Sequence, residues 1–195
     1  MTSPWQAALG DRLDELDPAL RDYFSAIPAG KVGRGSGVFE TVGTPRRWLW
    51  PMLAILGRAG IVFPVWAHDV PFDVVNSPAD GVVRAQRTFH FVGGDRVMLD
   101  EIGVTSAGLV DVLGRRRRLR APLESTVVAG RVELRSRGAA LRVGRLWLPL
   151  PFAPRVHLVE QRDGDRQRVE LTMTMPVVGR IYEYAGSFSY RIEER

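Results

Sequence analysis

Apolar and polar residues alternate through the last third of the chain, from Arg155 to Glu193, as is typical of β-strands with one buried face. Asp163-Gly164 interrupts the alternation with a strong hairpin signal, because a type I′ turn needs a positive φ at both central residues. A turn there places Leu158 opposite Val169 and leaves the polar residues on the other face. The segment therefore predicts an antiparallel hairpin whose register is fixed by burial of its apolar face.

A second turn is expected at Val178-Gly179, after which the chain returns as a third strand. With that turn, Met173 lies opposite Tyr184 and Met175 lies opposite Tyr182. The apolar face then continues across all three strands. We therefore predict that these tyrosines and methionines point to the same side of the sheet.

Strand-like patterns separated by short turn signals also fill most of the chain before this segment. One hairpin is expected to turn at Gly93-Gly94, and another, formed by Gly130–Ser136 and Ala139–Arg145, at Arg137-Gly138. The proline-rich stretch Trp147–Pro154 predicts a stiff connection instead of a paired strand. Roughly nine or ten antiparallel strands result, and open sheets of that size tend to curl or close.

The most apolar predicted helix is Arg46–Gly60, which carries large side chains on nearly every side and has to be covered on most of them. Shorter helices are expected at Trp5–Leu16 and from Asp17, as N-cap, through Phe24. The expected fold is α+β and mostly antiparallel β, a half-barrel or barrel wrapped around the hydrophobic helix. We predict a single domain, 1–195, with N-terminal helices in 1–30, a strand and the central helix in 31–60, and the antiparallel sheet in 61–195.

Composition excludes some classes of function. The chain has no cysteine, which rules out disulfides, a thiol nucleophile and zinc–thiolate sites. The net charge is +5, but Lys31 is the single lysine, and such an excess of arginine is what a GC-rich coding bias would give. We therefore do not interpret the basicity as a sign of nucleic-acid binding.

Two apolar features bear on location. The N-terminus lacks the basic and apolar regions of a signal peptide, so a cytoplasmic location is expected. The stretch Trp48–Ala67 has the length of a membrane span, but Arg58 lies in its middle and prolines interrupt it. A buried helix followed by a strand is therefore the prediction for this stretch.

Four short segments share a pattern with known proteins: Leu16–Arg21, Gly35–Val42, Ala85–Phe89 and Pro176–Phe188. Together they resemble the bacterial domain-of-unknown-function family four-one-six-six (DUF4166). Ala85 stands where the family pattern Trp-x-Arg-x-Phe has its tryptophan. The resemblance implies no activity. Some relatives are attached to nucleotide-binding dehydrogenase or epimerase-like domains, which implies, by analogy alone, a role beside such an enzyme.

Arg87 is the most informative polar position, because the turn at Gly93-Gly94 places it opposite Asp100 on an apolar face. A buried arginine needs a partner, so a structural ion pair is predicted, with an anchor for an anion or polar head group as the functional alternative. The alternating tyrosines of the last strand are expected to fill the core or to form the wall of an apolar ligand cavity. The candidate ligand-binding residues are Arg87, Phe89, Asp100, Tyr182 and Tyr184.

The remaining motifs give weaker signals. His68, His90 and His157 share no ligand spacing, so no metal is expected, and no cofactor motif is present. Gly33–Gly37 could be taken for a phosphate-binding loop, but a strand-like segment follows it, which indicates a bend leading into a strand. The basic run Arg115–Arg120 has no interleaved aromatic residues, which favours a solvated hairpin over a nucleic-acid site or contact with a membrane surface.

Three functional hypotheses follow. The first is a domain that binds a hydrophobic small molecule in a curved-sheet cavity or acts as an accessory to a partner enzyme. The second is an enzyme with a cavity site around Arg87 and Asp100. The third is a protein-interaction module that docks through Trp147–Pro154. A cavity lined by Arg87 and the tyrosines would favour a ligand, whereas inward packing of Trp147 and Phe152 would exclude docking.

Overall fold

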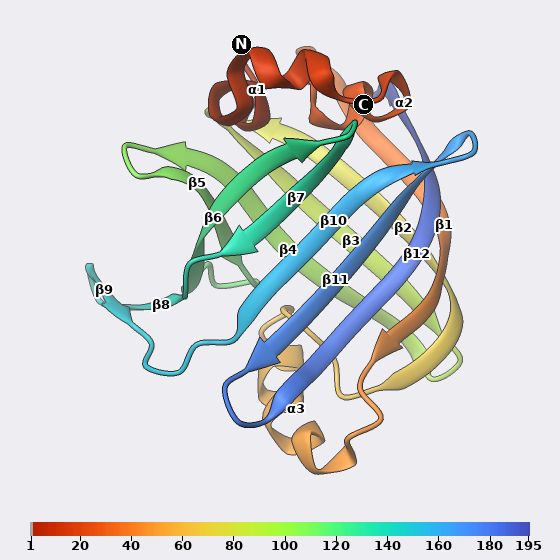
Figure 1. Ribbon diagram of the computed structural model, residues 1–195. Helices are drawn as coiled ribbons and strands as arrows, with labels where there is room; N and C mark the ends of the chain where they lie inside the picture. Colours follow the sequence, from red (N-terminus) through yellow and green to blue (C-terminus); the bar gives the residue numbers. More distant parts are fainter. Residues whose placement is uncertain (1) are drawn as a thin grey trace.

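A closed barrel of 10 antiparallel strands forms the body of the molecule (Figure 1). The computed structural model describes residues 2–195. The sheet runs in the order β5-β4-β3-β2-β1-β12-β11-β10-β7-β6, and pairing of β5 with β6 closes it. The barrel strands are β1 (Lys31–Gly43), β2 (Trp66–Ala79), β3 (Val82–Phe91), β4 (Gly94–Thr105), β5 (Gly108–Leu113), β6 (Leu119–Val128), β7 (Arg131–Ser136), β10 (Arg155–Asp163), β11 (Arg166–Met175) and β12 (Gly179–Glu194).

Short helices cover the two ends of the barrel (Figure 1). At one end lie α1 (Pro4–Leu9), the 3₁₀ turn η1 (Gly10–Glu15) and α2 (Pro18–Phe24); at the other lie the 3₁₀ turn η2 (Arg47–Leu49) and α3 (Trp50–Arg58). Ser3 and Gln6 form a capping box that starts α1, and the predicted N-cap Asp17 accepts a hydrogen bond from the amide of Ala19 at 3.0 Å. Both caps satisfy amides that the first helical turn leaves free.

The position of α3 corrects one expectation from the sequence. The barrel is not wrapped around this helix; α3 lies across the lower end of the barrel in Figure 1, and the side chains of Trp48 and Ile55 are 65% and 66% exposed. Aromatic side chains from the strands fill the interior instead. Phe39 packs against Phe72 at 4.1 Å between ring centroids and against Phe89 at 5.2 Å. Strand side chains thus fill most of the interior, and none of the helices within residues 2–195 lies inside the barrel.

The C-terminal strands confirm the predicted inward face but not the predicted register. Leu158 pairs with Leu171, and Met173 pairs with Tyr182, two residues away from the expected partners. A shift of two residues keeps every side chain on its face, because strand side chains alternate with period two. Met173 and Tyr184 therefore lie on the same inner face, as predicted.

The second predicted hairpin, between residues 130–136 and 139–145, is wrong. β7 pairs instead with β6 and β10. The turn that joins β6 to β7 is Ala129-Gly130, and both of its residues have a positive φ. The following residues form β8 (Ala140–Val143) and β9 (Leu146–Pro149), a hairpin outside the barrel. The stretch predicted to be a stiff connection thus contains the edge strand β9, and Phe152 beyond it is 78% exposed.

Glycines on β1 allow β12 to pack closely against it. The predicted glycine-rich bend is in fact part of the continuously paired strand β1, where Gly35 pairs with Tyr190 and Gly37 with Phe188. A Cβ added at Gly37 would overlap the carbonyl oxygen of Ser187 and lie 2.7 Å from the Cα of Phe188. Aromatic side chains of β12 occupy the space that the missing side chains leave.

Substituting Gly37→Ala is therefore expected to lower the free energy of unfolding by about 1–3 kcal/mol, because the added methyl group meets backbone atoms that cannot move aside. Chemical denaturation measures the change. Gly93→Ala is the matched control, since Gly93 has open space around its Cα and an ordinary φ. The control is expected to stay within about 0.5 kcal/mol of the unaltered protein. Equal costs for the two substitutions would contradict the close β1–β12 approach.

Candidate functional site

A cavity of about 110 Å³ lies inside the barrel. Apolar side chains from the strands and from both ends form most of its wall, among them Trp5, Ile61, Met98, Leu134, Val156, Leu158 and Met173. Polar side chains also reach it: Tyr23, Arg87, Asp100, Asp111, Glu160 and Tyr184. An apolar cavity with a few converging polar groups is the usual form of a small-molecule site.

Arg87 and Asp100 form the central ion pair of this cavity, as the sequence predicted. The strand register places Asp100 opposite Ala85 and Arg87 opposite Met98, so the guanidinium reaches diagonally to the carboxylate. The Arg87 side chain is 19% exposed and that of Asp100 is 4% exposed. The second guanidinium nitrogen donates to the hydroxyl of Tyr23 at 3.4 Å.

Two further carboxyl groups lie in the cavity wall. Glu160 on β10 is buried and accepts a hydrogen bond from the side-chain amide of Gln167 on β11. On β5, one carboxylate oxygen of Asp111 is buried with no hydrogen-bond partner among residues 2–195. The cavity wall therefore contains three carboxyl groups and a single guanidinium.

Burial dominates the protonation of these groups. Desolvation raises the pKa of Glu160 to about 7, against the opposing charge of Arg87. Desolvation, together with the nearby Asp100, raises the pKa of Asp111 well above its ordinary value. For Arg87, burial acts to lower the pKa, but the effects of Asp100, Tyr23 and Tyr184 are larger together, and the pKa is raised. The guanidinium thus stays charged while Glu160 changes protonation state near neutral pH.

A smaller cavity of about 20 Å³ adjoins the first and shares Tyr23, Arg87, Glu160 and Tyr184 with it. This volume is enough for one water molecule, which needs two to four polar partners. A water molecule there would have Arg87 as a donor and Glu160 as an acceptor among the lining residues. The polar groups of the wall can therefore be linked through solvent as well as directly.

Comparison with known families identifies the chain. A family model described as a domain of unknown function (DUF4166) matches residues 16–188. The chain belongs to this family. Comparison with curated proteins and with solved structures gave no match. The family match leaves the activity of the DUF4166 barrel open, so its function has to be argued from the cavity.

The five ligand-binding candidates occupy two different environments in the DUF4166 barrel. Arg87, Asp100 and Tyr184 line the cavity. Phe89 and Tyr182 are fully buried and lie outside the cavity wall, Phe89 within the aromatic cluster. The Tyr182 hydroxyl has no side-chain partner in the described chain, and burial raises its pKa.

Sequence reasoning did not single out Glu160, Asp111 or Tyr23. A signal was present for the two acids, because Glu160 continues the inward alternation of Val156 and Leu158. Asp111 likewise lies between the inward residues Leu109 and Leu113. An acid at an inward position of a DUF4166 strand is the feature that points to the site. Tyr23 comes from α2, and its contact with the barrel interior has no counterpart in the strand pattern.

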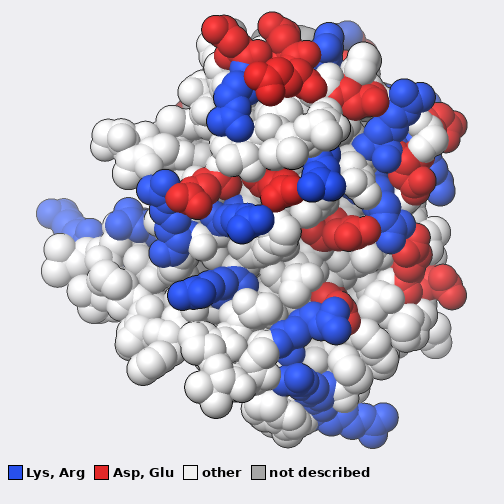
Figure 2. Space-filling model, in the orientation of Figure 1, with Lys and Arg blue, Asp and Glu red and all other residues white. Residues whose placement is uncertain are grey.

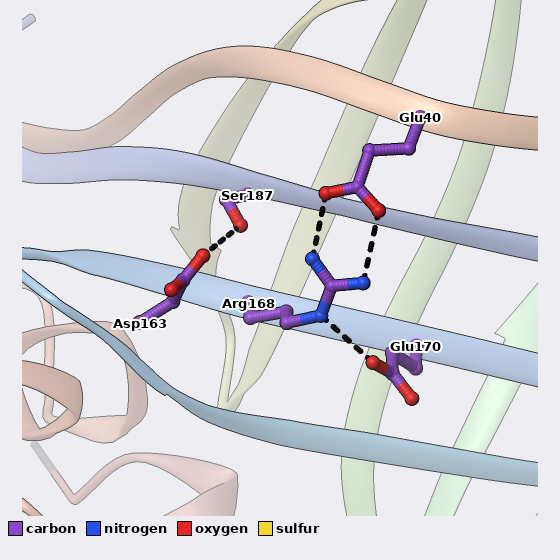
Figure 3. Close-up of polar contacts among 5 residues, drawn as sticks. All are labelled: Glu40, Asp163, Arg168, Glu170 and Ser187. Carbon is purple, nitrogen blue, oxygen red and sulfur yellow. Dashed lines mark hydrogen bonds and ion pairs between the residues drawn. The ribbon is translucent and has the colours of Figure 1, made fainter. Parts of the chain in front are cut away.

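A second polar cluster lies on the outer surface of the barrel (Figure 3). Arg168 on β11 spans β12 to form a bidentate pair with Glu40 on β1, at 2.7 and 2.9 Å, and also binds Glu170 at 2.7 Å. Glu40 is the extra residue of a β-bulge, which turns its carboxylate toward Arg168. The guanidinium lowers the pKa of Glu40. This cluster joins β11 to β1 across β12, and none of its residues lines the cavity inside the barrel, so we interpret it as structural.

Metal binding finds no support in the geometry of the DUF4166 chain. Within residues 2–195, no group of three or more His, Asp or Glu side chains is arranged to hold a metal ion. The three histidines lie apart: His90 between Asp73 and Asp95, each at 2.9 Å, His157 beside Glu133 at 3.5 Å, and His68 near Thr41.

Within residues 2–195, no helix is both long and apolar enough to cross a bilayer.

Proposed function

We propose that the protein binds a small molecule whose apolar group enters the barrel cavity and whose polar end meets Arg87, Glu160 and Asp111. The observation that carries this proposal is an internal apolar cavity into which buried charged groups converge. Burying charges is costly and gives a structure little stability in return. A barrel with no ligand to orient would be more stable with an apolar wall.

The size of the cavity limits what it takes in. A volume of about 110 Å³ is below the 300–1,000 Å³ typical of pockets that enclose a whole drug-sized ligand. It is close to the engineered cavity of about 150 Å³ that binds benzene. The cavity therefore accepts a ring or a short branched chain. Met98 and Met173 in the wall are unbranched and flexible, which allows a somewhat larger group to enter.

A second candidate is an enzyme that uses the same cavity. It is favoured by Glu160, whose pKa of about 7 suits a group that takes up and releases a proton near neutral pH. In that case Arg87 would stabilise developing negative charge and Asp100 would hold the guanidinium in place. Turnover of a bound ligand that stops in Glu160→Gln, with ligand binding intact, would distinguish the enzyme from a binding protein.

Native mass spectrometry of freshly purified protein tests the proposed binding. We expect an additional mass that is released on unfolding. Ala121→Phe is expected to abolish that mass, because a phenyl ring on this cavity-lining residue would fill most of 110 Å³. The control, Leu148→Phe, changes an exposed residue of the outer hairpin and is expected to leave the bound mass in place.

A second cavity variant keeps the test decisive if Ala121→Phe fails to fold. Val156→Phe fills the same space from β10, and near-UV circular dichroism reports whether each variant has a packed core. A bound mass that persists in a folded cavity variant would overturn the assignment to this cavity. The proposal also fails if no mass is bound and benzene, which suits the volume, does not raise the midpoint of thermal unfolding.

A further inference from the structure

Large apolar side chains are exposed on the helix that covers the lower end of the barrel. In η2 and α3, Trp48 is 65% exposed, Ile55 is 66% exposed and Met52 is 38% exposed. The opposite side of α3 is anchored in the core through Leu53, which is 1% exposed. The exposed side chains thus belong to a segment that is packed against the core through Leu53.

Two turns contact the segment that contains this helix, one at each end of the segment. On one side, Arg46 donates a hydrogen bond to the carbonyl of Val178 in the β11–β12 turn, where the fully exposed Val177 projects. On the other, the amide of Arg115 in the β5–β6 loop donates to the carbonyl of Ala59 at 2.8 Å. The three segments 44–60, 114–118 and 176–180 therefore form one continuous surface, which we call the α3 end.

The α3 end is basic and contains no acidic residue. Its guanidinium groups come from all three segments: Arg46, Arg47, Arg58, Arg115, Arg116, Arg117, Arg118 and Arg180. Arg117 pairs with Glu101 and Arg180 with Glu183 on the adjoining strands, whereas the other six form no ion pair within residues 2–195. Exposed apolar side chains and unpaired guanidinium groups are therefore interspersed on one surface.

The opposite end of the molecule has the reverse charge. Its helical segment contains Asp11, Asp14, Glu15, Asp17 and Asp22 against two arginines. Figure 2 shows acidic atoms gathered at the top, over the end with α1 and α2, and mainly basic and uncharged atoms in the lower part. In the field of a negatively charged surface, such a molecule turns its α3 end toward that surface.

We propose that the α3 end binds the surface of a bilayer containing anionic lipids. Trp48 and Ile55 enter the interface between head groups and acyl chains, and the unpaired arginines contact the lipid phosphates. The run Arg115–Arg118 has no aromatic neighbours in sequence, and for that reason contact with a membrane surface was not expected from the sequence. In the folded protein, the α3 end also contains Trp48, which comes from the segment 44–60. A protein partner would be expected to cover the apolar residues with few unpaired charges among them, because interface cores are depleted in charge.

Co-sedimentation with lipid vesicles tests this proposal. The protein is expected to bind vesicles in which roughly a third of the lipid is phosphatidylglycerol, and to bind phosphatidylcholine vesicles much more weakly. Raising the salt concentration to about 0.5 M should weaken binding to the anionic vesicles, because salt screens exposed charges. Trp48→Ser combined with Ile55→Ser is expected to reduce binding by about tenfold or more.

Two further variants separate the contributions. Arg46→Gln combined with Arg47→Gln should weaken binding to the anionic vesicles and leave the weak binding to phosphatidylcholine unchanged. The matched control, Val104→Ser combined with Val128→Ser, alters two exposed apolar residues that lie outside the α3 end and should bind as the unaltered protein does. All the substituted side chains are exposed, so the variants are expected to fold.

Three results would overturn the proposal. The first is no binding to anionic vesicles, and the second is binding that Trp48→Ser with Ile55→Ser leaves unchanged. The third is a stable dimer, seen by light scattering, that the same double variant dissociates while vesicles bind neither form; the α3 end would then be an interface between copies of the chain. None of these outcomes depends on whether the barrel cavity is occupied.

Discussion

Replacing Arg87 with methionine is expected to lower the free energy of unfolding by about 3–5 kcal/mol at neutral pH. The substitution leaves the Asp100 carboxylate buried and without its partner, and breaking a buried ion pair from one side costs about that much. Methionine matches the unbranched stem of arginine, so the loss of packing is small. Urea denaturation followed by tryptophan fluorescence measures the change.

A double variant and a surface control test the explanation. Arg87→Met combined with Asp100→Leu removes both charges and should recover most of the lost stability, since apolar replacement of a buried pair is often neutral or stabilising. Arg84→Met breaks the exposed pair with Glu101, at 2.9 Å on the outer face of the same strands, and is expected to cost about 1 kcal/mol or less. Similar costs for Arg84→Met and Arg87→Met would show that Asp100 is not held as a buried charge.

Glu160→Gln is expected to make the protein more stable at pH 8, by up to about 3 kcal/mol, and to have a smaller effect at pH 5. The pKa of Glu160 is raised from 4.5 to about 7 in the folded protein, so the folded state binds the proton more tightly than the unfolded chain. The stability that this proton contributes is complete below about pH 4.5 and is lost as the pH rises through about 7. Glutamine stays neutral and avoids this loss.

Denaturation curves recorded between pH 5 and pH 8 check this expectation. The control is Glu170→Gln, which alters an exposed carboxylate on the neighbouring strand and should change stability by less than about 1 kcal/mol at either pH. If the difference between Glu160→Gln and the unaltered protein were the same at both pH values, Glu160 would not have a raised pKa. The role of this side chain in the cavity would then need another explanation.

The sequence predicts which way side chains point better than it predicts which residues pair. The alternation in the last three strands was enough to place Met173 and Tyr184 on one inner face, because side-chain direction depends only on the parity of position in a strand. The register was two residues off in both hairpins, because the β10–β11 turn forms one residue later than the predicted Asp163-Gly164, whereas the β11–β12 turn, residues 176–178, forms earlier than the predicted Val178-Gly179. Gly164 and Gly179 both adopt a positive φ, but Gly164 is the first residue of its turn and Gly179 follows its turn as the first residue of β12.

Longer-range features were beyond the pattern. Closure of the barrel depends on β5 pairing with β6, and no local signal distinguishes a closed barrel from an open curled sheet. The predicted helix Arg46–Gly60, which forms η2 and α3, was expected inside because of its apolar composition, yet Trp48 and Ile55 are exposed. Composition shows that a surface is apolar, but not what covers it.

The cavity was predictable in part. The pairing of Arg87 with Asp100 followed from the rule that a buried charge needs a partner, even though the exact opposition of the two residues was wrong. Glu160 and Asp111 were overlooked because an acid in a strand is usually on the solvent side. Their side chains line one cavity only because the closed fold places β5 and β10 around the same interior.

Closure of the barrel also determines where the chain can tolerate a change in length. Each of its ten strands is bonded to a neighbour on both sides, so deleting one would break two ladders and reopen the cylinder. The β8–β9 hairpin is under no such restraint, because it is attached at one edge and its loops face solvent. Gains and losses of residues during divergence should therefore accumulate in this outer hairpin while the cylinder keeps its number of strands.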